Sequence, residues 1–389
     1  MIGERTTRLD ALAAEQAFSR TQGRLARAFL DRPRLGRSGL KTDIYYSSDR
    51  ISFAQINPFA FYAPELRRRF GAELRFRPVE PLLAGTSTSG RNAEVVLFQT
   101  WFTVDPKRLQ TALQRIRDAN PRAVIAFVDG FAHNDIRLAR FVSEHIDFYL
   151  KKSLFKDQSQ YFLSFEGDTN LTQFYGRLFG IDQTPTDWQT PPSILPKLKL
   201  SPNFFTAPTL LKRFLQDAPR LDGDRPIDLH ARLATRGNPS YAAMRRAAME
   251  AAKSLKGLNV PTETGIPWKR YLQEMGRSKL CFSPFGYGEL CWRDIEAFLS
   301  GAVLVKPDMS HLSTLPNLYE PRETYLPVAW DFSNLEEVVR EALADDALRE
   351  RLAIAAFDRV ADYLRKGNFV NDMADLFDRA DMLRGRTAE

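Results

Sequence analysis

The stretch from Ser278 to Val305 holds the residues whose types and spacing are best suited to bind a phosphate. It reads SKLCFSPFGYGELCWRDIEAFLSGAVLV, which predicts an apolar strand, a loop with Gly286 and Gly288, a helix and a second strand. A helix that follows a strand in such a unit points its N-terminal amides at the crevice where ligands bind. Arg293 falls in the first turn, where the helix dipole disfavours a cation, so a bound anion explains it better than local stability does.

Glu296 lies three residues after Arg293, on the same predicted helix face. A carboxylate there is suited to accept hydrogen bonds from two neighbouring ribose hydroxyls, as acidic residues do in dinucleotide sites. The alternative is an ordinary exposed ion pair between these two side chains. Together, the glycines, the arginine and the glutamate predict a site for a phosphate-bearing anion and favour a sugar nucleotide.

A wider pattern runs through the same stretch, namely C-x-x-P-x-G, then W-R-x-x-E-A, then G-x-x-x-V. The residues that supply it are Cys281, Pro284, Gly286, Trp292, Arg293, Glu296, Ala297, Gly301 and Val305. The pattern resembles the donor-binding motif of exostosin-like glycosyltransferases and their bacterial relatives. This resemblance implies a GT-B architecture, in which two Rossmann-like domains face each other across a cleft. It also implies a donor nucleotide on the C-terminal domain, an acceptor on the N-terminal one, and no essential metal.

Two glutamates depart from a related pattern. Retaining GT-B enzymes of the glycogen-synthase type have seven residues between two glutamates, whereas six separate Glu289 from Glu296. Gly288 stands where the first glutamate of that motif belongs. The sequence therefore favours an inverting enzyme and leaves the part played by Glu289 open.

Further donor-binding candidates follow two other predicted strands. Arg232 and Arg236 come after the strand in PIDLHARL, where relatives carry a basic residue for the donor phosphates; the alternative is surface charge beside a strand. His311 follows the strand AVLVKP at the same predicted sheet edge and is suited to bond a phosphate or a sugar hydroxyl. A lone histidine with a structural role is the alternative for His311.

An inverting transfer needs a general base to take the proton of the acceptor hydroxyl. The best cluster in the N-terminal half is VIAFVDGFAHND, where Asp129 follows a buried strand and His133 comes four residues later. Asp129 is equally suited to cap a following helix. Asp49 and Arg50 hold the analogous place after the first predicted strand, where relatives often bind the acceptor.

The elements that must position these residues alternate between strands and helices. TDIYYSS, AEVVLFQ, AVIAFVDG and IDFYLKK predict strands, with helical stretches such as Pro106 to Asn120 between them, so we expect α/β domains with parallel sheets. Six prolines from Asp182 to Pro208 predict an extended connector. We therefore predict an N-terminal domain over residues 1–205 and a C-terminal domain over 206–367. The resemblance adds a last helix, residues 368–389, that packs back on the first domain.

Composition limits the class of protein. With 389 residues, 44% hydrophobic and 26% charged, the chain is expected to fold into two globular domains. Its net charge of +7 favours anionic partners, but no nucleic-acid module is visible, and we predict no nucleic-acid partner. The two cysteines lack metal-site spacing, which predicts no metal. A predicted basic helix from Thr6 to Leu30 is suited to peripheral contact with an anionic membrane, or is simply a solvated face.

These observations predict a glycosyltransferase that moves a sugar from a nucleoside diphosphate sugar to a glycan or lipid-linked acceptor, as in polysaccharide biosynthesis. We expect it to be inverting and to need neither a metal nor a cofactor besides the donor. The N-terminus lacks the apolar stretch of a signal peptide and no apolar run is long enough to span a bilayer, which predicts a cytoplasmic protein, peripheral at the inner membrane face. Two alternatives are a sugar-nucleotide epimerase on the same scaffold and a non-catalytic basic protein that binds nucleic acid or membranes.

Overall fold

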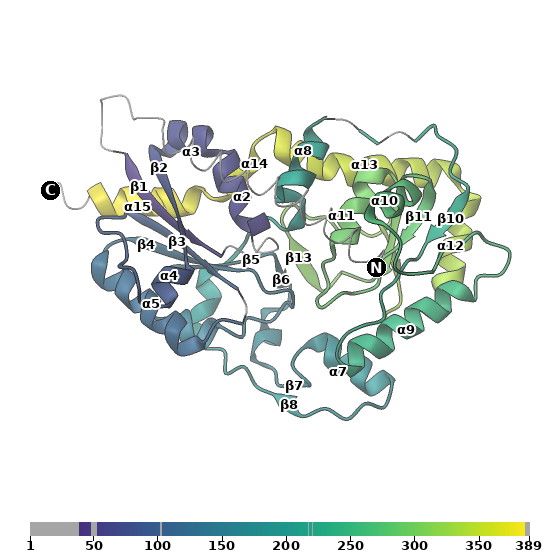
Figure 1. The fold of residues 1–389 in the computed structure, drawn as a ribbon, viewed down its shortest axis with the longest axis horizontal. Coiled ribbons are helices and arrows are strands. Elements are labelled where there is room, and N and C mark those ends of the chain that lie inside the picture. Colours follow the sequence, from purple (N-terminus) through teal and green to yellow (C-terminus); the bar gives the residue numbers. More distant parts are fainter. Residues whose placement is uncertain (1–38, 48–52, 102, 217, 220, 386–389) are drawn as a thin grey trace.

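Two parallel sheets organise the chain in the computed structural model (Figure 1). The structure describes residues 39–47, 53–101, 103–216, 218–219 and 221–385. The helix predicted at Thr6 to Leu30 and the pair Asp49 and Arg50 lie outside these residues.

The first sheet has six parallel strands in the order β2-β1-β3-β4-β5-β9. Their bounds are β1 Leu40–Tyr46, β2 Ala72–Pro78, β3 Val95–Thr100, β4 Val124–Asp129, β5 Phe148–Lys151 and β9 Leu198–Leu200. Every residue of β3 and β4 is buried, as expected of central strands in a parallel sheet that is covered on both faces. The loops that follow β4 and β5 therefore leave the sheet at the same edge.

The second sheet has four parallel strands in the order β10-β11-β12-β14. Their bounds are β10 Ile227–His230, β11 Ser278–Phe282, β12 Val303–Pro307 and β14 Leu326–Val328. The helices packed against it include α10 Trp268–Gly276, α11 Trp292–Ser300, α12 Leu335–Ala344 and α13 Asp346–Arg365. The loop between β11 and α11 is the one for which the sequence predicts an anion site.

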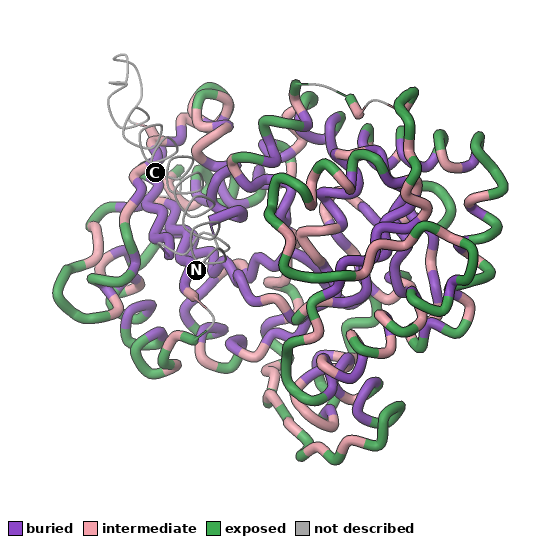
Figure 2. The backbone as a smooth tube through the Cα atoms, turned by 45° about the vertical axis from the view of Figure 1, so that its right-hand side comes forward, coloured by how far each residue is buried: buried purple, intermediate pink, exposed green. Residues whose placement is uncertain are grey.

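The remaining helices connect or cover the sheets. They are α2 Phe53–Phe61, α3 Ala63–Phe70, α4 Glu80–Leu83, α5 Pro106–Ala119, α6 Ala139–Val142, α7 Asn170–Leu178, α8 Pro208–Gln216, α9 Pro239–Lys253, α14 Asn368–Asp372 and α15 Ala374–Gly385. Short 3-10 turns occur at Gln158–Phe162, Pro192–Lys197 and Phe204–Thr206. Figure 2 shows the buried residues concentrated along the strands of the two sheets.

Several elements join the two halves of the chain. Strand β6 (Ser153–Phe155) pairs antiparallel with β13 (Leu312–Thr314), so a loop after β5 lies beside a loop after β12. Helix α7 packs against α9, near a short ribbon of β7 (Phe165–Glu166) and β8 (Pro185–Thr186). The last helix, α15, returns to the first sheet and packs against β1, β3 and β4 (Figure 1). The loops at the carboxyl ends of the two sheets thereby approach each other.

The predicted fold class, α/β with two parallel-sheet domains, is confirmed by these strand orders. The helix predicted after the loop with Gly286 and Gly288 is α11. The connector predicted to be extended contains β9, which extends the first sheet by one parallel strand. The sequence pattern did not predict β2 or α10.

Candidate functional site

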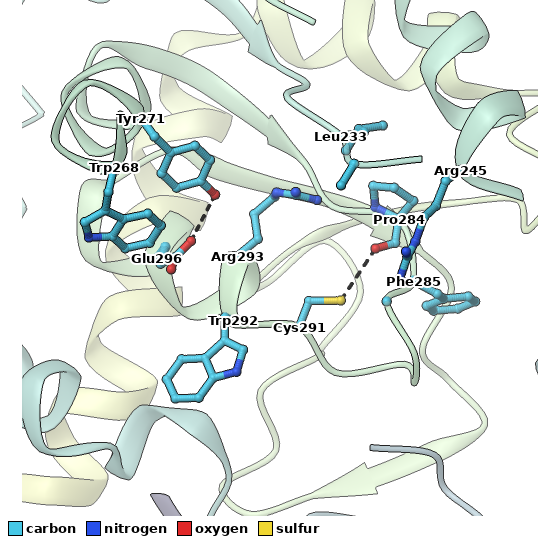
Figure 3. Close-up of a pocket in the computed structure, with 12 residues that line it drawn as sticks. Leu233, Arg245, Trp268, Tyr271, Pro284, Phe285, Cys291, Trp292, Arg293 and Glu296 are labelled. Atoms are coloured by element: carbon cyan, nitrogen blue, oxygen red, sulfur yellow. Dashed lines mark hydrogen bonds between the residues drawn. The ribbon is translucent and has the colours of Figure 1, made fainter. Parts of the chain in front are cut away.

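A cavity of about 370 Å³ lies at the carboxyl end of the second sheet, between α9, α10 and α11 (Figure 3). The polar and aromatic residues that line it include Arg245, Trp268, Tyr271, Gly286, Arg293 and Glu296. They come from three helices and from the loop after β11, as expected for a ligand crevice beyond the strand ends of an open α/β sheet.

The start of α11 is fixed by a buried carboxylate, Asp294. Its side chain accepts hydrogen bonds from the backbone N–H of Cys291 at 3.0 Å, from the Ser283 hydroxyl at 2.6 Å and from the Tyr319 hydroxyl at 2.7 Å. Lys306 forms an ion pair with it at 3.2 Å, with both side chains 0% exposed. Because partners from the loop after β11 and from β12 converge on Asp294, the first turn of α11 is held rigidly beside the cavity.

Arg293 supplies an unneutralised positive charge to the cavity. Its Nη2 donates to the backbone carbonyl of Arg232 at 3.0 Å, while its buried Nε has no hydrogen-bond partner. Among the described residues, no carboxylate forms an ion pair with Arg293, and the alternative of an ordinary ion pair with Glu296 is therefore not observed. A buried donor without a partner costs about 1–3 kcal/mol, a cost that a bound anion would remove.

Arg245 of α9 is a second cation in the cavity, and the sequence pattern did not predict it. Its guanidinium donates to the backbone carbonyl of Arg236 and lies 5.0 Å from the centre of the Tyr287 ring. It too lacks a carboxylate partner in the part of the chain that the structure describes. Arg236, which the sequence predicts to bind the donor phosphates, is exposed and does not line the cavity. Its contribution to the site is the carbonyl that holds Arg245.

Arg232 is already neutralised by two glutamates. Its guanidinium makes a two-pronged contact with Glu274, at 2.5 and 3.0 Å, and a further contact with the Glu263 carboxylate at 3.1 Å. The hydrogen bonds to Glu274 raise the pKa of Arg232 above its ordinary value. A phosphate would therefore compete with two carboxylates for this side chain. In the structure Arg232 helps to position Arg293 through its carbonyl oxygen.

Glu296 lies one turn into α11 and is nearly buried. The Tyr271 hydroxyl donates to its Oε2 at 2.9 Å, and burial raises the pKa of the carboxyl group. Trp268 stacks on Tyr271, with ring centres 5.0 Å apart and an interplanar angle of 14°, and stays 45% exposed. Figure 3 shows Trp268 and Phe285 at opposite ends of the cavity, with Arg293 between them. The cavity thus runs from an aromatic end, past a carboxylate, to the two arginines.

The two glycines of the loop after β11 have different surroundings. Gly286 lines the cavity and donates its N–H to the carbonyl of Gly288 at 2.9 Å. A Cβ on Gly288 would lie 2.0 Å from the carbonyl oxygen of Ala132, in the loop after β4. Gly288 therefore permits close contact between the two halves of the chain, and it does not line the cavity.

The predicted catalytic carboxylate, Asp129, is fully engaged. It accepts hydrogen bonds of 2.8 Å from each of three groups: the Lys151 ammonium, the Tyr149 hydroxyl and the Phe131 backbone N–H. Both members of the ion pair with Lys151 are buried. The three donors engage both oxygens of this carboxylate.

His133 lies in the same loop and meets the second half of the chain. Its ring stacks on Tyr241 of α9, with centres 5.7 Å apart, and it contacts Phe131 edge-on. Burial lowers the pKa of His133 below its ordinary value, and its Nε2 is buried without a hydrogen-bond partner. The predicted roles of Asp129 and His133 in proton transfer remain predictions.

His311 and Glu289 meet between the two sheets, beyond the cavity. His311 Nε2 lies 3.7 Å from Glu289 Oε1, and Asn170 of α7 donates to the same carboxylate oxygen at 3.1 Å. Burial by itself raises the pKa of Glu289, but the contacts with His311 and Asn170 outweigh it, and the pKa is lowered. The pair is thus an ionised buried carboxylate beside a partly exposed imidazole.

Comparisons with known proteins give similarity in fold only. No family model matches the sequence, and no curated protein matches it. Among solved structures, a protein of Listeria monocytogenes described as a UDP-N-acetylglucosamine 2-epimerase is 11% identical, with a TM-score of 0.43 over 83% of this chain and 94% of the other. A glycosyltransferase of Rickettsia africae is 8% identical, with a TM-score of 0.46 over 89% of this chain and 99% of the other. TarM is 10% identical with a TM-score of 0.43, and the similarity covers 73% of this chain and 54% of TarM.

No helix in the described part of the chain combines the length and the apolar character needed to span a bilayer. No group of three or more His, Cys, Asp and Glu side chains among the described residues is arranged to hold a metal ion.

Proposed function

We propose that this protein is a glycosyltransferase that takes a sugar from a nucleoside diphosphate sugar. The observation that carries the proposal is the pair of guanidinium groups, Arg245 and Arg293, that line one cavity without carboxylate partners among the described residues. A diphosphate carries the charge and the acceptor oxygens that these groups lack. Glu296 and Trp268 lie in the same cavity and are suited to the rest of a nucleotide.

The order of residues along the cavity suggests how the donor lies. We place the nucleobase on the exposed face of Trp268, the ribose hydroxyls on Glu296, and the diphosphate between Arg293 and Arg245, beside Gly286. This order follows the arrangement in Figure 3, in which the aromatic end, the carboxylate and the arginines succeed one another. The sugar would then extend past Phe285 towards the first sheet.

The chemistry asked of this cavity is stabilisation of a leaving group. When the bond between the sugar and the phosphate breaks, the nucleoside diphosphate gains negative charge, and preorganised cations in a partly buried site favour that change. In this proposal Arg245 and Arg293 supply the positive charge, so the reaction needs no metal. We further propose inversion at the anomeric carbon, with a glycan or lipid-linked acceptor bound on the side of the first domain, residues 1–205.

Binding of sugar nucleotides tests the proposal directly. A thermal-shift panel of UDP-glucose, UDP-N-acetylglucosamine, GDP-mannose and dTDP-glucose should contain a donor that raises Tm, because a ligand at a hundred times its Kd stabilises the fold by about 2.7 kcal/mol. Arg293→Met and Glu296→Ala should remove the shift at unchanged basal Tm. Arg246→Ala is the matched control, since Arg246 is an exposed arginine next to Arg245 that does not line the cavity.

The products separate transfer from epimerisation. A transferase releases nucleoside diphosphate and leaves the unreacted donor unchanged, whereas an epimerase converts the donor sugar to its epimer. Epimer formation would contradict the proposal, as would a full thermal shift in both cavity variants. Tight, salt-sensitive binding of duplex DNA with no response to any sugar nucleotide would favour the nucleic-acid alternative.

A further inference from the structure

The proposed reaction requires a group that takes the proton of the acceptor hydroxyl. Three buried polar atoms at the meeting of the two sheets have no hydrogen-bond partner in the structure. They are Nε2 of His133, Nε2 of His311 and Oε2 of Glu289. A buried polar atom without a protein partner is a candidate for contact with a ligand or a water molecule.

His311 and Glu289 have the relation of a general base to the group that orients it. The carboxylate of Glu289 is buried and ionised, and a hydrogen bond from the side-chain amide of Asn170 fixes its position. His311 turns Nε2 towards that carboxylate at 3.7 Å, so an N–H at this position is favoured. No hydrogen bond to Nδ1 occurs within the described residues, which leaves its lone pair available.

The position of His311 relative to the cavity suits a sugar that extends out of it. Phe285 lines the cavity at the end opposite Trp268 (Figure 3). Trp330 packs on Phe285 with ring centres 5.2 Å apart, and His311 packs on Trp330 at 5.1 Å. His311 therefore lies one aromatic ring beyond the diphosphate end, on the side where β13 meets β6 of the first half. The side chain is 25% exposed and can be reached by a ligand.

Asp129 and His133 are less suited than His311 to act as the general base. Asp129 already accepts from Lys151, Tyr149 and a backbone N–H. His133 lies between aromatic rings, and its Nδ1 is 3.5 Å from a guanidinium nitrogen of Arg137. Burial of His133 disfavours the protonated form that a general base must adopt, and it lowers the pKa of this side chain.

We infer that His311 is the general base of the transfer and that Glu289 is the residue that positions it. The inference rests on the proposed transferase function. Nδ1 of His311 takes the proton from the acceptor hydroxyl as the acceptor oxygen bonds to the anomeric carbon. The bond from that carbon to the phosphate oxygen breaks, and the nucleoside diphosphate leaves with the electron pair. The imidazolium gains Glu289 as a counter-charge, and the proton then passes to solvent.

Chemical rescue is the decisive measurement, since a structural role would not give it. The probe is the donor with the largest thermal shift in the panel, with water as the acceptor and release of nucleoside diphosphate as the signal. His311→Ala should lower kcat by about 10²- to 10⁴-fold and leave the donor Kd within about twofold of wild type. Imidazole in the buffer should restore turnover at least about tenfold, because the vacated space borders solvent. Wild type and His133→Ala serve as controls that imidazole leaves unchanged.

Glu289→Gln gives an independent readout. The amide keeps the shape but loses the charge, so kcat should fall on the order of 10²-fold while the donor KM stays constant. Unchanged kcat in His311→Ala, or rescue of His133→Ala in its place, would overturn the inference. A wild-type protein that binds no donor and releases no nucleoside diphosphate would instead contradict the proposed function. If the Glu289 variant does not fold, the His311 experiment decides alone.

Discussion

The exposed ring of Trp268 allows the orientation of the donor to be tested by one substitution. Trp268 is the first residue of α10; it rests one face on Tyr271, and 45% of it remains exposed at the edge of the cavity. If the nucleobase lies on this ring, Trp268→Ala removes a stacking partner and leaves both arginines and Glu296 in place. The loss should therefore fall on the nucleoside part of the ligand alone.

The size of the effect follows from the energy of base stacking. One base on one aromatic ring contributes about 1–3 kcal/mol. Since about 1.4 kcal/mol corresponds to a tenfold change, UDP should bind about 5- to 150-fold more weakly to the variant. Inorganic pyrophosphate has no base, so its affinity should change by less than about twofold. Trp268→Phe should lie between wild type and Trp268→Ala.

Isothermal titration of UDP and of pyrophosphate into the same preparations measures both numbers. Phe162→Ala is the matched control, because Phe162 is 41% exposed and does not line the cavity. An equal loss of affinity for UDP and pyrophosphate would show that Trp268 acts by positioning the side chains of Arg245 and Arg293. No loss for UDP would show that the base lies elsewhere. Either result refutes the proposed direction of the donor.

Two further predictions concern stability, measured by urea unfolding. Burial, and then the charge of Lys151, lower the pKa of Lys152 to about 7 from an ordinary value of 10.5. The unfolded chain thus binds more protons than the folded one between these values, so stability should rise with pH by up to about 1.4 kcal/mol per unit. Lys152→Met should flatten that rise, and an unchanged slope would contradict the assignment. Gly288→Ala should cost about 1–3 kcal/mol or more, because its Cβ would lie 2.0 Å from the Ala132 carbonyl oxygen. Gly286→Ala, whose nearest contact is a sulfur atom at 3.2 Å, should cost less; equal losses would contradict the close approach at Gly288.

The apolar pattern of the sequence was sufficient for most of the fold. Runs of apolar residues predict the central strands, and these residues are buried in the structure. The glycine-containing loop before α11 and Gly301 after it indicate where this helix begins and ends. Helix α10 was missed although its signal is present: Pro267 precedes it, and Trp268, Tyr271 and Met275 share one helical face. Missing α10 also removed Trp268 and Tyr271 from the predicted site.

The types and order of the residues do not show which arginines pair with carboxylates in the folded chain. Arg232 and Arg245 both follow β10, and by sequence the former is the better phosphate ligand because it is closer to the strand end. In the structure two glutamates from the loop before α10 and from α10 itself neutralise Arg232, whereas Arg245 keeps its charge for the cavity. Which arginine is free depends on contacts between segments about 30 to 40 residues apart, as for Arg232 with Glu263 and Glu274, which differ by 31 and 42 positions. Such contacts appear only once the chain is folded.

The loop after β11 shows most clearly how one short segment serves both halves of the site. The sequence presents Gly286 and Gly288 as one phosphate-binding turn, yet only Gly286 borders the cavity, while Gly288 lies against the loop after β4. The carboxylate of Glu289, the next residue, lies 3.7 Å from Nε2 of His311, outside the cavity. Donor binding at Gly286 and the orientation of His311 therefore depend on the same four-residue stretch. A donor that orders this loop would also set the distance between His311 and Glu289, so binding of the nucleotide and readiness for proton transfer are expected to be coupled.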